Sequence, residues 1–185
     1  MSNTPPNVQR IPEYARGDEW TRNFLHHAHI GHIATRWDDQ PFITPTTFWY
    51  DEERHEIIFH SNITGRVRAN IERHNRVCFE TSEAGRFLPS NVALEFSVQY
   101  ASVIAFGTVR IIKDAEAKRR ALYGLIEKYF PGMAAGKEYR SITDEELVST
   151  SVYAISIESW SGKENQPEQA EQSDEWAPLA EQWLE

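Results

Sequence analysis

The spacing of hydrophobic residues changes along the chain from a helical to a strand-like period and back again. A helix is expected after Asp18, another over about 65–74, and the clearest one from Asp114 to a stop at Pro131. A capping box over 143–146 predicts one further brief helix. Between these helices the apolar runs are short and bounded by polar turns, which is typical of strands.

The strand-like runs predict the fold class. Most of them are joined by short polar turns, so antiparallel pairing is expected, and a sheet of this size commonly closes into a barrel. We therefore expect a mainly β (α+β) fold, a six-stranded antiparallel β-barrel with flanking helices. The predicted strands cover residues 31–37, 41–50, 56–61, 76–81, 94–112 and 152–159, with a loop over 82–93.

The two ends of the chain differ from this central region. Residues 1–16 contain three prolines and are predicted to form an extended arm. The segment 164–185 carries seven carboxylates and no Lys or Arg. It is expected either to be disordered or to lie across another surface through Trp176 and Trp183. The predicted division is an N-terminal arm (1–16), a barrel (17–163) and an acidic tail (164–185).

Composition and charge narrow the function classes. The 185 residues are 40% hydrophobic and 25% charged, as in an ordinary globular domain. The net charge of −9 argues against a general nucleic-acid or anionic-membrane binder, which needs a basic face. Because much of the acidity lies in the tail, the rest of the chain can still form a local basic pocket. The single Cys78 excludes an intramolecular disulfide framework and a cysteine-built zinc site. No signal-peptide pattern is present, so a cytoplasmic location is expected.

The strongest chemical signal is the sequence FHSNITGR at 59–66. An apolar strand ends in His60 and Ser61, and a glycine, Gly65, precedes Arg66 at a helix start. Free N–H groups at a helix N-terminus attract anions, and an arginine can donate two hydrogen bonds to a phosphate. These features predict a phosphate site. The spacing alone also allows an alternative, in which Asn62 or Thr64 only caps the helix and the arginines face solvent.

A second signal is the sequence TPTTFWY at 44–50. Pro45 confines its strand to an edge or a bulge, where backbone groups are unpaired. Such groups can bond to the rim of a planar heterocycle while Phe48 or Trp49 supplies an apolar wall. The alternative is a plain barrel strand with both aromatic rings in the core.

Clustered imidazoles raise the possibility of a metal or haem ligand, because imidazoles three residues apart can share a helical face. No carboxylates accompany them, and the predicted break between helix and strand separates them. The end of a helix, where the dipole favours imidazolium, accounts for them better, and no metal site is predicted. The cluster comprises His26, His27, His29 and His32.

Taken together, six segments resemble the pyridoxamine 5′-phosphate oxidase-like FMN-binding split barrels, and most closely the group that contains the nitroimidazole-resistance proteins. They occur in family order over about residues 20–163. The resemblance implies a Greek-key split barrel that forms a homodimer with FMN in the cleft between the subunits. The segments are GHIAT (31–35), QPFITP (40–45), IFHS with GR (58–61 and 65–66), NRVCFE (75–80), YASV with a following glycine (100–103 and 107) and WSGK (160–163).

The resemblance also implies cofactor-binding positions. One strand lines the isoalloxazine ring, one segment holds the phosphate, and two further positions complete the set. These positions are Pro45, Thr46, Thr47 and Phe48 for the ring, His60, Ser61, Gly65 and Arg66 for the phosphate, and Ser102 and Trp160.

Two departures from the family pattern matter. Val67 stands where many members carry a lysine, and Arg68 follows it. The C-terminal arginine segment of true pyridoxamine 5′-phosphate oxidases is replaced by a tail rich in Gln, Glu and Trp, so that activity is not expected.

The implied function is a flavin-dependent oxidoreductase that acts on a small molecule, such as a nitroaromatic compound, with NAD(P)H as donor. The flavin would carry the chemistry, and His60 is the best candidate for an acid or base. The alternatives are a non-catalytic FMN-binding or redox-sensing module, a haem-binding split barrel with an axial histidine, and a deazaflavin protein.

Overall fold

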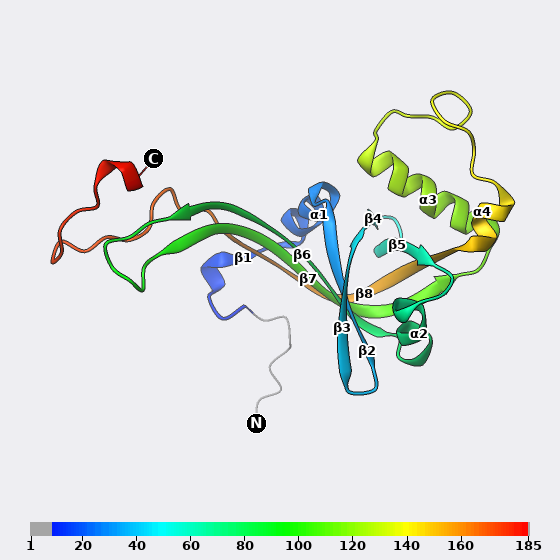
Figure 1. Cartoon of the computed structure of the whole chain (residues 1–185), viewed down its shortest axis with the longest axis horizontal. Helices are drawn as coiled ribbons and strands as arrows, with labels where there is room; N and C mark the ends of the chain where they lie inside the picture. The colour runs from blue at the N-terminus through cyan, green and yellow to red at the C-terminus, as the bar shows by residue number, and fades with distance from the viewer. Residues whose placement is uncertain (1–8, 185) are drawn as a thin grey trace.

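An antiparallel sheet forms the framework of the structure, a computed structural model that describes residues 9–184 (Figure 1). The strands lie in the order β3-β2-β6-β7-β8-β5-β4, and β1 pairs with β8. Every strand pair in the described part of the chain is antiparallel. The strands are β1 (Ala15–Arg16), β2 (Ile30–Trp37), β3 (Gln40–Thr47), β4 (Trp49–Asp51), β5 (Glu56–Asn62), β6 (Arg76–Leu88), β7 (Ser97–Ile112) and β8 (Thr150–Asn165).

Helices lie at the ends and on the faces of this sheet. α1 packs against β4, β7 and β8, α2 against β2 and β5, and α3 against β4, β5 and β8. Within residues 9–184, no helix has both the length and the apolar character required to cross a bilayer. The helices are α1 (Asp18–His27), α2 (Arg66–Arg73), α3 (Ala115–Tyr129) and α4 (Asp144–Ser149), with 3-10 turns at Pro12–Tyr14 and Glu181–Trp183.

This arrangement confirms the expected mainly β (α+β) antiparallel split barrel with flanking helices. The sheet has eight strands rather than six. β1 has only two residues, and the strand predicted over 41–50 is divided at Phe48 into β3 and β4. The division has a clear cause, because the backbone N–H and C=O of Phe48 bond to the hydroxyl of Tyr129.

The core lies inside the curved sheet, where alternate residues of each strand point inward. Phe48 and Phe79 pack there at a ring distance of 4.7 Å, and Phe59 stacks on Tyr153 at the same distance. Gly31 makes the first pair possible, because a Cβ at this position would lie 2.2 Å from the Phe79 ring. The phenyl pair thus requires a glycine on the neighbouring strand.

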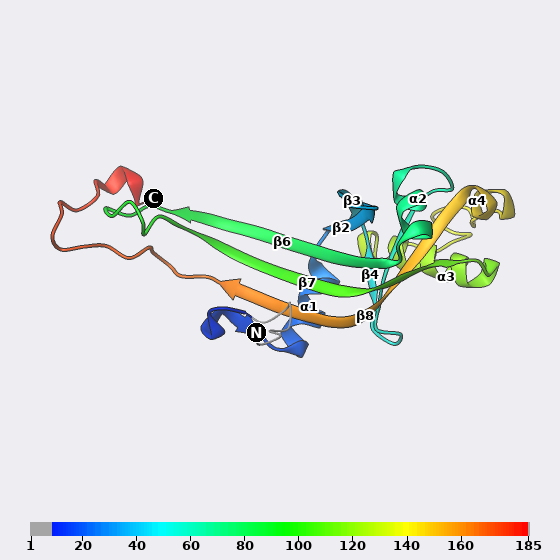
Figure 2. The ribbon, with the colours of Figure 1, turned by 90° about the horizontal axis from the view of Figure 1, so that it is seen from below.

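Beyond the barrel, β6, β7 and β8 continue as a long arm, visible in Figures 1 and 2. The predicted strand 76–81 and loop 82–93 were wrong in this respect, since β6 runs on to Leu88 and β8 runs on to Asn165. The polar sequence around Gly85 gives no strand-like pattern that would predict this extension. It is held by pairing with β7 through a bulge between Ala84 and Phe87, a long-range contact that leaves no local periodicity.

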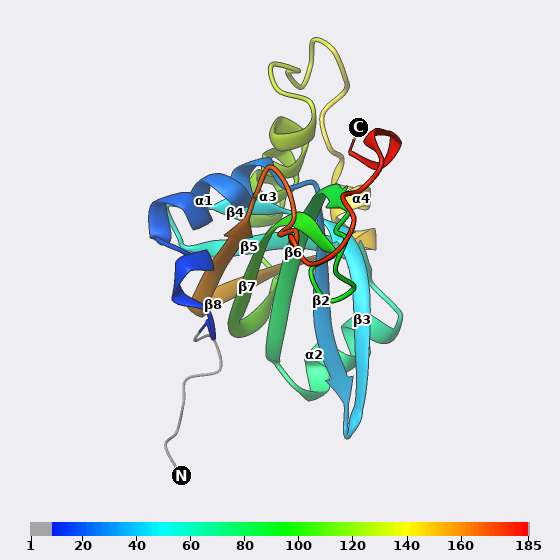
Figure 3. The ribbon, with the colours of Figure 1, turned by 90° about the vertical axis from the view of Figure 1, so that its left-hand side faces the viewer.

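The acidic tail lies along this arm, as Figure 3 shows from the arm end. The arm donates hydrogen bonds to tail carbonyl groups, from Gln99 to Pro167 at 2.9 Å and from Ser90 to Glu171 at 2.6 Å. The Trp176 side chain is 71% exposed, and Trp183 is also mostly exposed. Backbone contacts, rather than these two indole rings, therefore hold the tail. At the other end, β1 pairs with β8, while residues 1–8 of the predicted arm lie outside the described residues.

Candidate functional site

The phosphate-like segment forms the end of β5, a short loop and the first turn of α2. Asn62 Oδ1 accepts hydrogen bonds from the backbone N–H and the hydroxyl of Thr64, at 3.1 and 3.2 Å. Gly65 follows with φ +124°, a conformation that favours glycine. Among the described residues, no side chain caps the first turn of α2. The polar side chains therefore stabilise the loop and leave the helix N–H groups available to an anion.

Two arginines lie on this turn and differ in what they contact. Arg68 bonds to Glu72 at 2.5 Å and to the hydroxyl of Ser151 at 2.9 Å. Arg66 has no carboxylate partner within the described residues, and its guanidinium lies 5.8 Å from the ring centre of Phe42 on β3. Arg66 is thus the available cation of this turn, whereas Arg68 is already engaged.

Strand alternation separates two of the predicted phosphate residues. Ser61 lies on the same face of β5 as Phe59, and its hydroxyl is 3.2 Å from that of Tyr153. His60 therefore points to the opposite face, which it shares with Ile58 under α3. Part of the His60 side chain is exposed to solvent. The atoms packed around the rest of it exclude water, and this burial lowers the pKa of His60. The lowered pKa disfavours the imidazolium, which is the form that would offer a charge to a phosphate.

β3 lies at one end of the sheet and, within residues 9–184, pairs only with β2, which agrees with the edge position that its proline allowed. Its inner face carries Phe42, Thr44 and Thr46, opposite inward residues of β2. The Thr44 hydroxyl is buried and has no hydrogen-bond partner among the described residues. An unpaired buried hydroxyl is costly, so it is a fitting contact for a polar ligand. The sequence did not indicate Thr44 or Phe42 as site residues. They become candidates only because β3 lies close to the start of α2 in the folded chain.

The expected apolar wall is not formed by the residues proposed for it. The Phe48 side chain is fully buried in the core, and its backbone groups are bonded to Tyr129. The Trp49 indole donates to the carbonyl of Ala121 on α3 at 2.9 Å. The Phe48 ring is a core residue, as the alternative interpretation held, and the Trp49 ring is partly buried against α3. The exposed apolar side chain beside Arg66 is Phe42.

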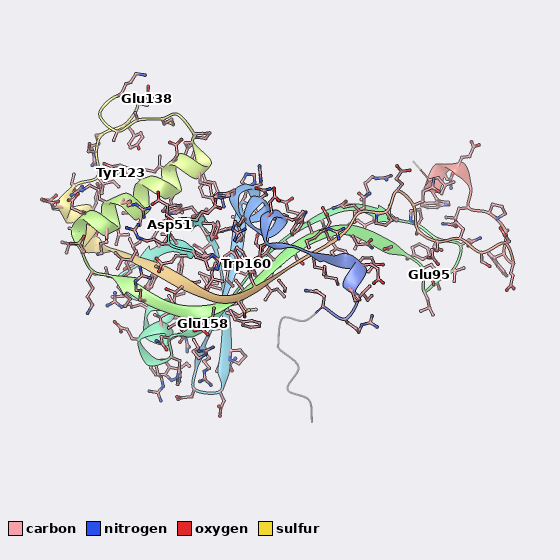
Figure 4. All side chains as sticks on the ribbon, turned by 180° about the vertical axis from the view of Figure 1, so that it is seen from behind. Asp51, Glu95, Tyr123, Glu138, Glu158 and Trp160 are labelled. Carbon is pink, nitrogen blue, oxygen red and sulfur yellow. The ribbon has the colours of Figure 1, made fainter. Side chains whose placement is uncertain are left out.

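Ser102 and Trp160 lie apart from this turn within one chain. Ser102 is paired with Lys163 and lies on the outer face of β7. The Trp160 indole donates to Asp18 at 2.8 Å and meets the imidazole of His55 at 4.6 Å, on the side of the sheet where α1 packs (Figure 4). The structure thus brings together Ser61, Gly65, Arg66 and β3, and it leaves these two elsewhere.

Part of the outer face of the sheet is apolar. Between Val98 and Phe106, the alternate β7 residues on this face are hydrophobic except for Ser102, whereas the positions paired with them on β6 and β2 include the polar Glu80 and His32. The register continues the face onto β3, where Ile43 lies on it. Several of these side chains are strongly exposed, including Ile43 at 63% and Phe87 at 82%. Exposed apolar side chains gathered on one face are typical of interaction surfaces. The β7 residues concerned are Val98, Tyr100, Ile104 and Phe106.

The four clustered histidines separate in space. His26 contacts Glu52 at 3.2 Å and His32 contacts Glu80 at 2.9 Å, while His27 bonds to the carbonyl of Asn23. The residues that the structure describes contain no group of three or more His, Cys, Asp or Glu side chains suited to a metal ion.

Comparisons with known proteins agree with the six-segment resemblance and confirm it. A family model described as pyridoxamine 5′-phosphate oxidase matches residues 18–164. The solved flavocytochrome Anf3 of Azotobacter vinelandii is similar, with 25% identity, a TM-score of 0.78, and coverage of 91% of this chain and 76% of that chain. No curated protein sequence matches.

Two further solved structures share the fold. A FAD- and haem-binding protein of Mycobacterium smegmatis has 23% identity and a TM-score of 0.77, covering 86% of this chain and 76% of its own. A candidate 5-nitroimidazole antibiotic resistance protein of Bacteroides thetaiotaomicron has 19% identity and a TM-score of 0.67, covering 81% of this chain and 90% of its own.

Proposed function

Because the chain belongs to the pyridoxamine 5′-phosphate oxidase family, we propose that it is a flavoprotein that binds FMN and transfers electrons to a small molecule. The single observation that carries the proposal is the uncapped first turn of α2 with the unpaired Arg66. This turn lies beside an edge strand whose backbone is open on one side. Such a turn suits a phosphate, and such a strand suits the rim of a flat heterocycle.

The roles of the chain's own residues follow from their placement. The N–H groups of the α2 turn, the Ser61 hydroxyl and Arg66 would hold the phosphate, with Arg66 donating a bidentate pair. The β3 backbone over 45–47 and the unpaired Thr44 hydroxyl would orient the ring. When bound, the flavin supplies the hydride and electron chemistry. The lowered pKa of His60 disfavours a charge contact from its imidazole to the phosphate, and Val67 leaves Arg66 as the main charge contact.

The apolar outer face supports a homodimer with the flavin site at the subunit interface. Ser102 lies on this face, so a second copy would bring it toward a site that one chain does not complete. We expect Ile43→Asp to yield monomers, because it places a charge on the apolar face. Val148→Asp is the matched control on α4, where the side chain is 76% exposed on another surface. Light scattering after size exclusion would decide, and a monomeric wild type would refute the homodimer.

A haem-binding split barrel is the second candidate, and the likeness to a flavocytochrome favours it. The absorption spectrum of the purified protein distinguishes the two. FMN gives two broad visible bands, whereas haem gives a sharp Soret band. A Soret band without flavin bands would overturn the FMN proposal.

Arg66→Ala tests the phosphate site directly. A lost charge-assisted hydrogen bond costs about 1.5–3 kcal/mol, so we expect FMN to bind roughly 10- to 100-fold more weakly. Riboflavin, which lacks the phosphate, should bind unchanged. The control is Arg73→Ala, which removes the same charge from the other end of α2, where Arg73 pairs with Asp38. Unchanged FMN affinity in Arg66→Ala would place the phosphate elsewhere.

Turnover needs its own measurement. Bleaching of the bound flavin by NADH or NADPH, followed by reoxidation with a nitroaromatic compound, would establish an oxidoreductase. A flavin that binds but is reduced by neither donor would favour the binding or redox-sensing module instead.

A further inference from the structure

The last turn of α3 holds the residue that follows β3. The Tyr129 hydroxyl accepts a hydrogen bond from the backbone N–H of Phe48 at 3.0 Å. It lies 2.9 Å from the Phe48 carbonyl and 2.6 Å from the His29 carbonyl, to either of which it can donate. His29 directly precedes β2, and Phe48 directly follows β3. One phenol therefore joins the two strand ends that meet at this side of the hairpin.

The neighbouring residue of α3 holds the same phenylalanine by its ring. Lys128 Nζ lies 3.6 Å from the ring centre of Phe48 and donates to the carbonyl of Leu25 in the last turn of α1 at 3.0 Å. The Phe48 ring also packs against Phe79 in the core. Backbone and side chain of Phe48 are thus both fixed by contacts from distant parts of the chain.

This attachment matters because β3 is an end strand. Within residues 9–184 it is hydrogen-bonded only to β2, and although it approaches β5, no strand ladder on its free side fixes how its backbone over 45–47 stands relative to α2. Phe48 is the next residue after that stretch. Its position therefore sets the position of the β3 groups that would face a ring, while the α2 turn would hold the phosphate independently.

We infer that Tyr129 is a positioning residue for the flavin ring, acting through Phe48 on the backbone of β3 without touching the cofactor. This inference rests on the proposed function. It assigns the position of the ring to a hydroxyl on α3 that lies 81 residues along the chain from Phe48, the residue it holds. The hydroxyl stays protonated at neutral pH, because burial raises the pKa of Tyr129.

The test compares FMN and riboflavin as ligands of the full-length protein. Tyr129→Phe keeps the ring and removes the hydroxyl, which leaves Phe48 backbone groups unpaired. We expect about tenfold weaker binding, the equivalent of one lost hydrogen bond, and the same factor for FMN and riboflavin. The visible bands of the bound flavin should also shift, since they report the surroundings of the ring.

The control is Tyr123→Phe on the same helix, labelled in Figure 4. Its hydroxyl also accepts a backbone hydrogen bond, from Ile142 N–H at 3.2 Å, but away from β3. It should lose comparable thermal stability while keeping both affinities and the spectrum. Lys128→Met provides a second variant on Phe48, with a smaller loss in the same direction for both ligands.

Each other outcome overturns the inference in a distinguishable way. Wild-type affinities and spectrum in Tyr129→Phe would show that the hydroxyl does not position the ring. A loss for FMN but not riboflavin would place the effect at the phosphate end. An equal loss in Tyr123→Phe would mean that general stability of α3 is responsible. Absence of flavin binding by the wild type would instead refute the proposed function, and the inference with it.

Discussion

The α2 turn and strand β3 come close together, yet they are held in place by opposite means. In the turn, Asn62 bonds to Thr64 two residues later, and Gly65 provides the backbone conformation. In β3, the decisive contact joins Phe48 to Tyr129 from another element. One candidate site thus contains a half built by local chemistry and a half built by tertiary contacts. Substitutions should therefore affect the two halves separately.

The largest effect is expected where the tertiary half depends on packing. Gly31→Val would force a side chain against the Phe79 ring, and already a Cβ would lie 2.2 Å from it and 3.0 Å from Phe48. Overpacking of a core costs about 1–3 kcal/mol or more, so we expect a fall in melting temperature of several degrees or failure to fold. Gly17→Ala, with nothing within 4 Å of the added Cβ, is the control. Equal melting temperatures for wild type and Gly31→Val would refute the packing argument.

A smaller effect is expected in the local half. Gly65→Ala places a side chain at φ +124° and should cost about 1–3 kcal/mol or make the turn rearrange. FMN binding should weaken while riboflavin binding is kept, because only the phosphate turn changes. Gly136→Ala introduces comparable strain at φ +83° in the loop after α3 and should leave both affinities intact. If both ligands weakened in Gly65→Ala, the two halves would not be separate.

The next prediction concerns pH and the contact on Phe48. Burial lowers the pKa of Lys128 from its ordinary 10.5 to about 7. Between these values the unfolded chain binds the proton and the folded chain does not. The free energy of unfolding should therefore rise with pH from about 7 to 10.5 and stay level below 7. Denaturant unfolding of wild type and Lys128→Met across this window would show it, and identical pH profiles would contradict it.

The smallest effect is expected at His60, the residue first considered for the phosphate and for acid–base chemistry. Its imidazole lies on the face of β5 opposite Ser61, and burial lowers its pKa, which disfavours the charged form. His60→Gln should change FMN affinity by less than about 0.5 kcal/mol, as for an ordinary surface substitution. Titration calorimetry with FMN measures this, and a tenfold loss would return His60 to the phosphate site.

Some of this molecule could be predicted with simple rules. Apolar runs joined by short polar turns predicted the antiparallel sheet, and the proline of β3 predicted an edge strand or a bulge. The segment 59–66 could be interpreted because its chemistry is contiguous. The extension of β6 could not, because Ser82 to Leu88 look like a loop until β7 pairs with them. Nor could the burial of Phe48, since an aromatic residue after a strand suits a core and a ligand wall equally well.

The local framework follows from the residues alone: the glycine and arginine at the start of α2, the proline of β3 and the acidity of the tail. Tertiary structure alone decided that Arg68 is engaged while Arg66 is available, that Thr44 keeps an unpaired hydroxyl, and that Tyr129 holds Phe48. The physical reason is the distance along the chain over which each kind of interaction acts. Backbone conformation and capping act over a few residues, whereas the availability of a side chain depends on partners that only the folded chain brings near.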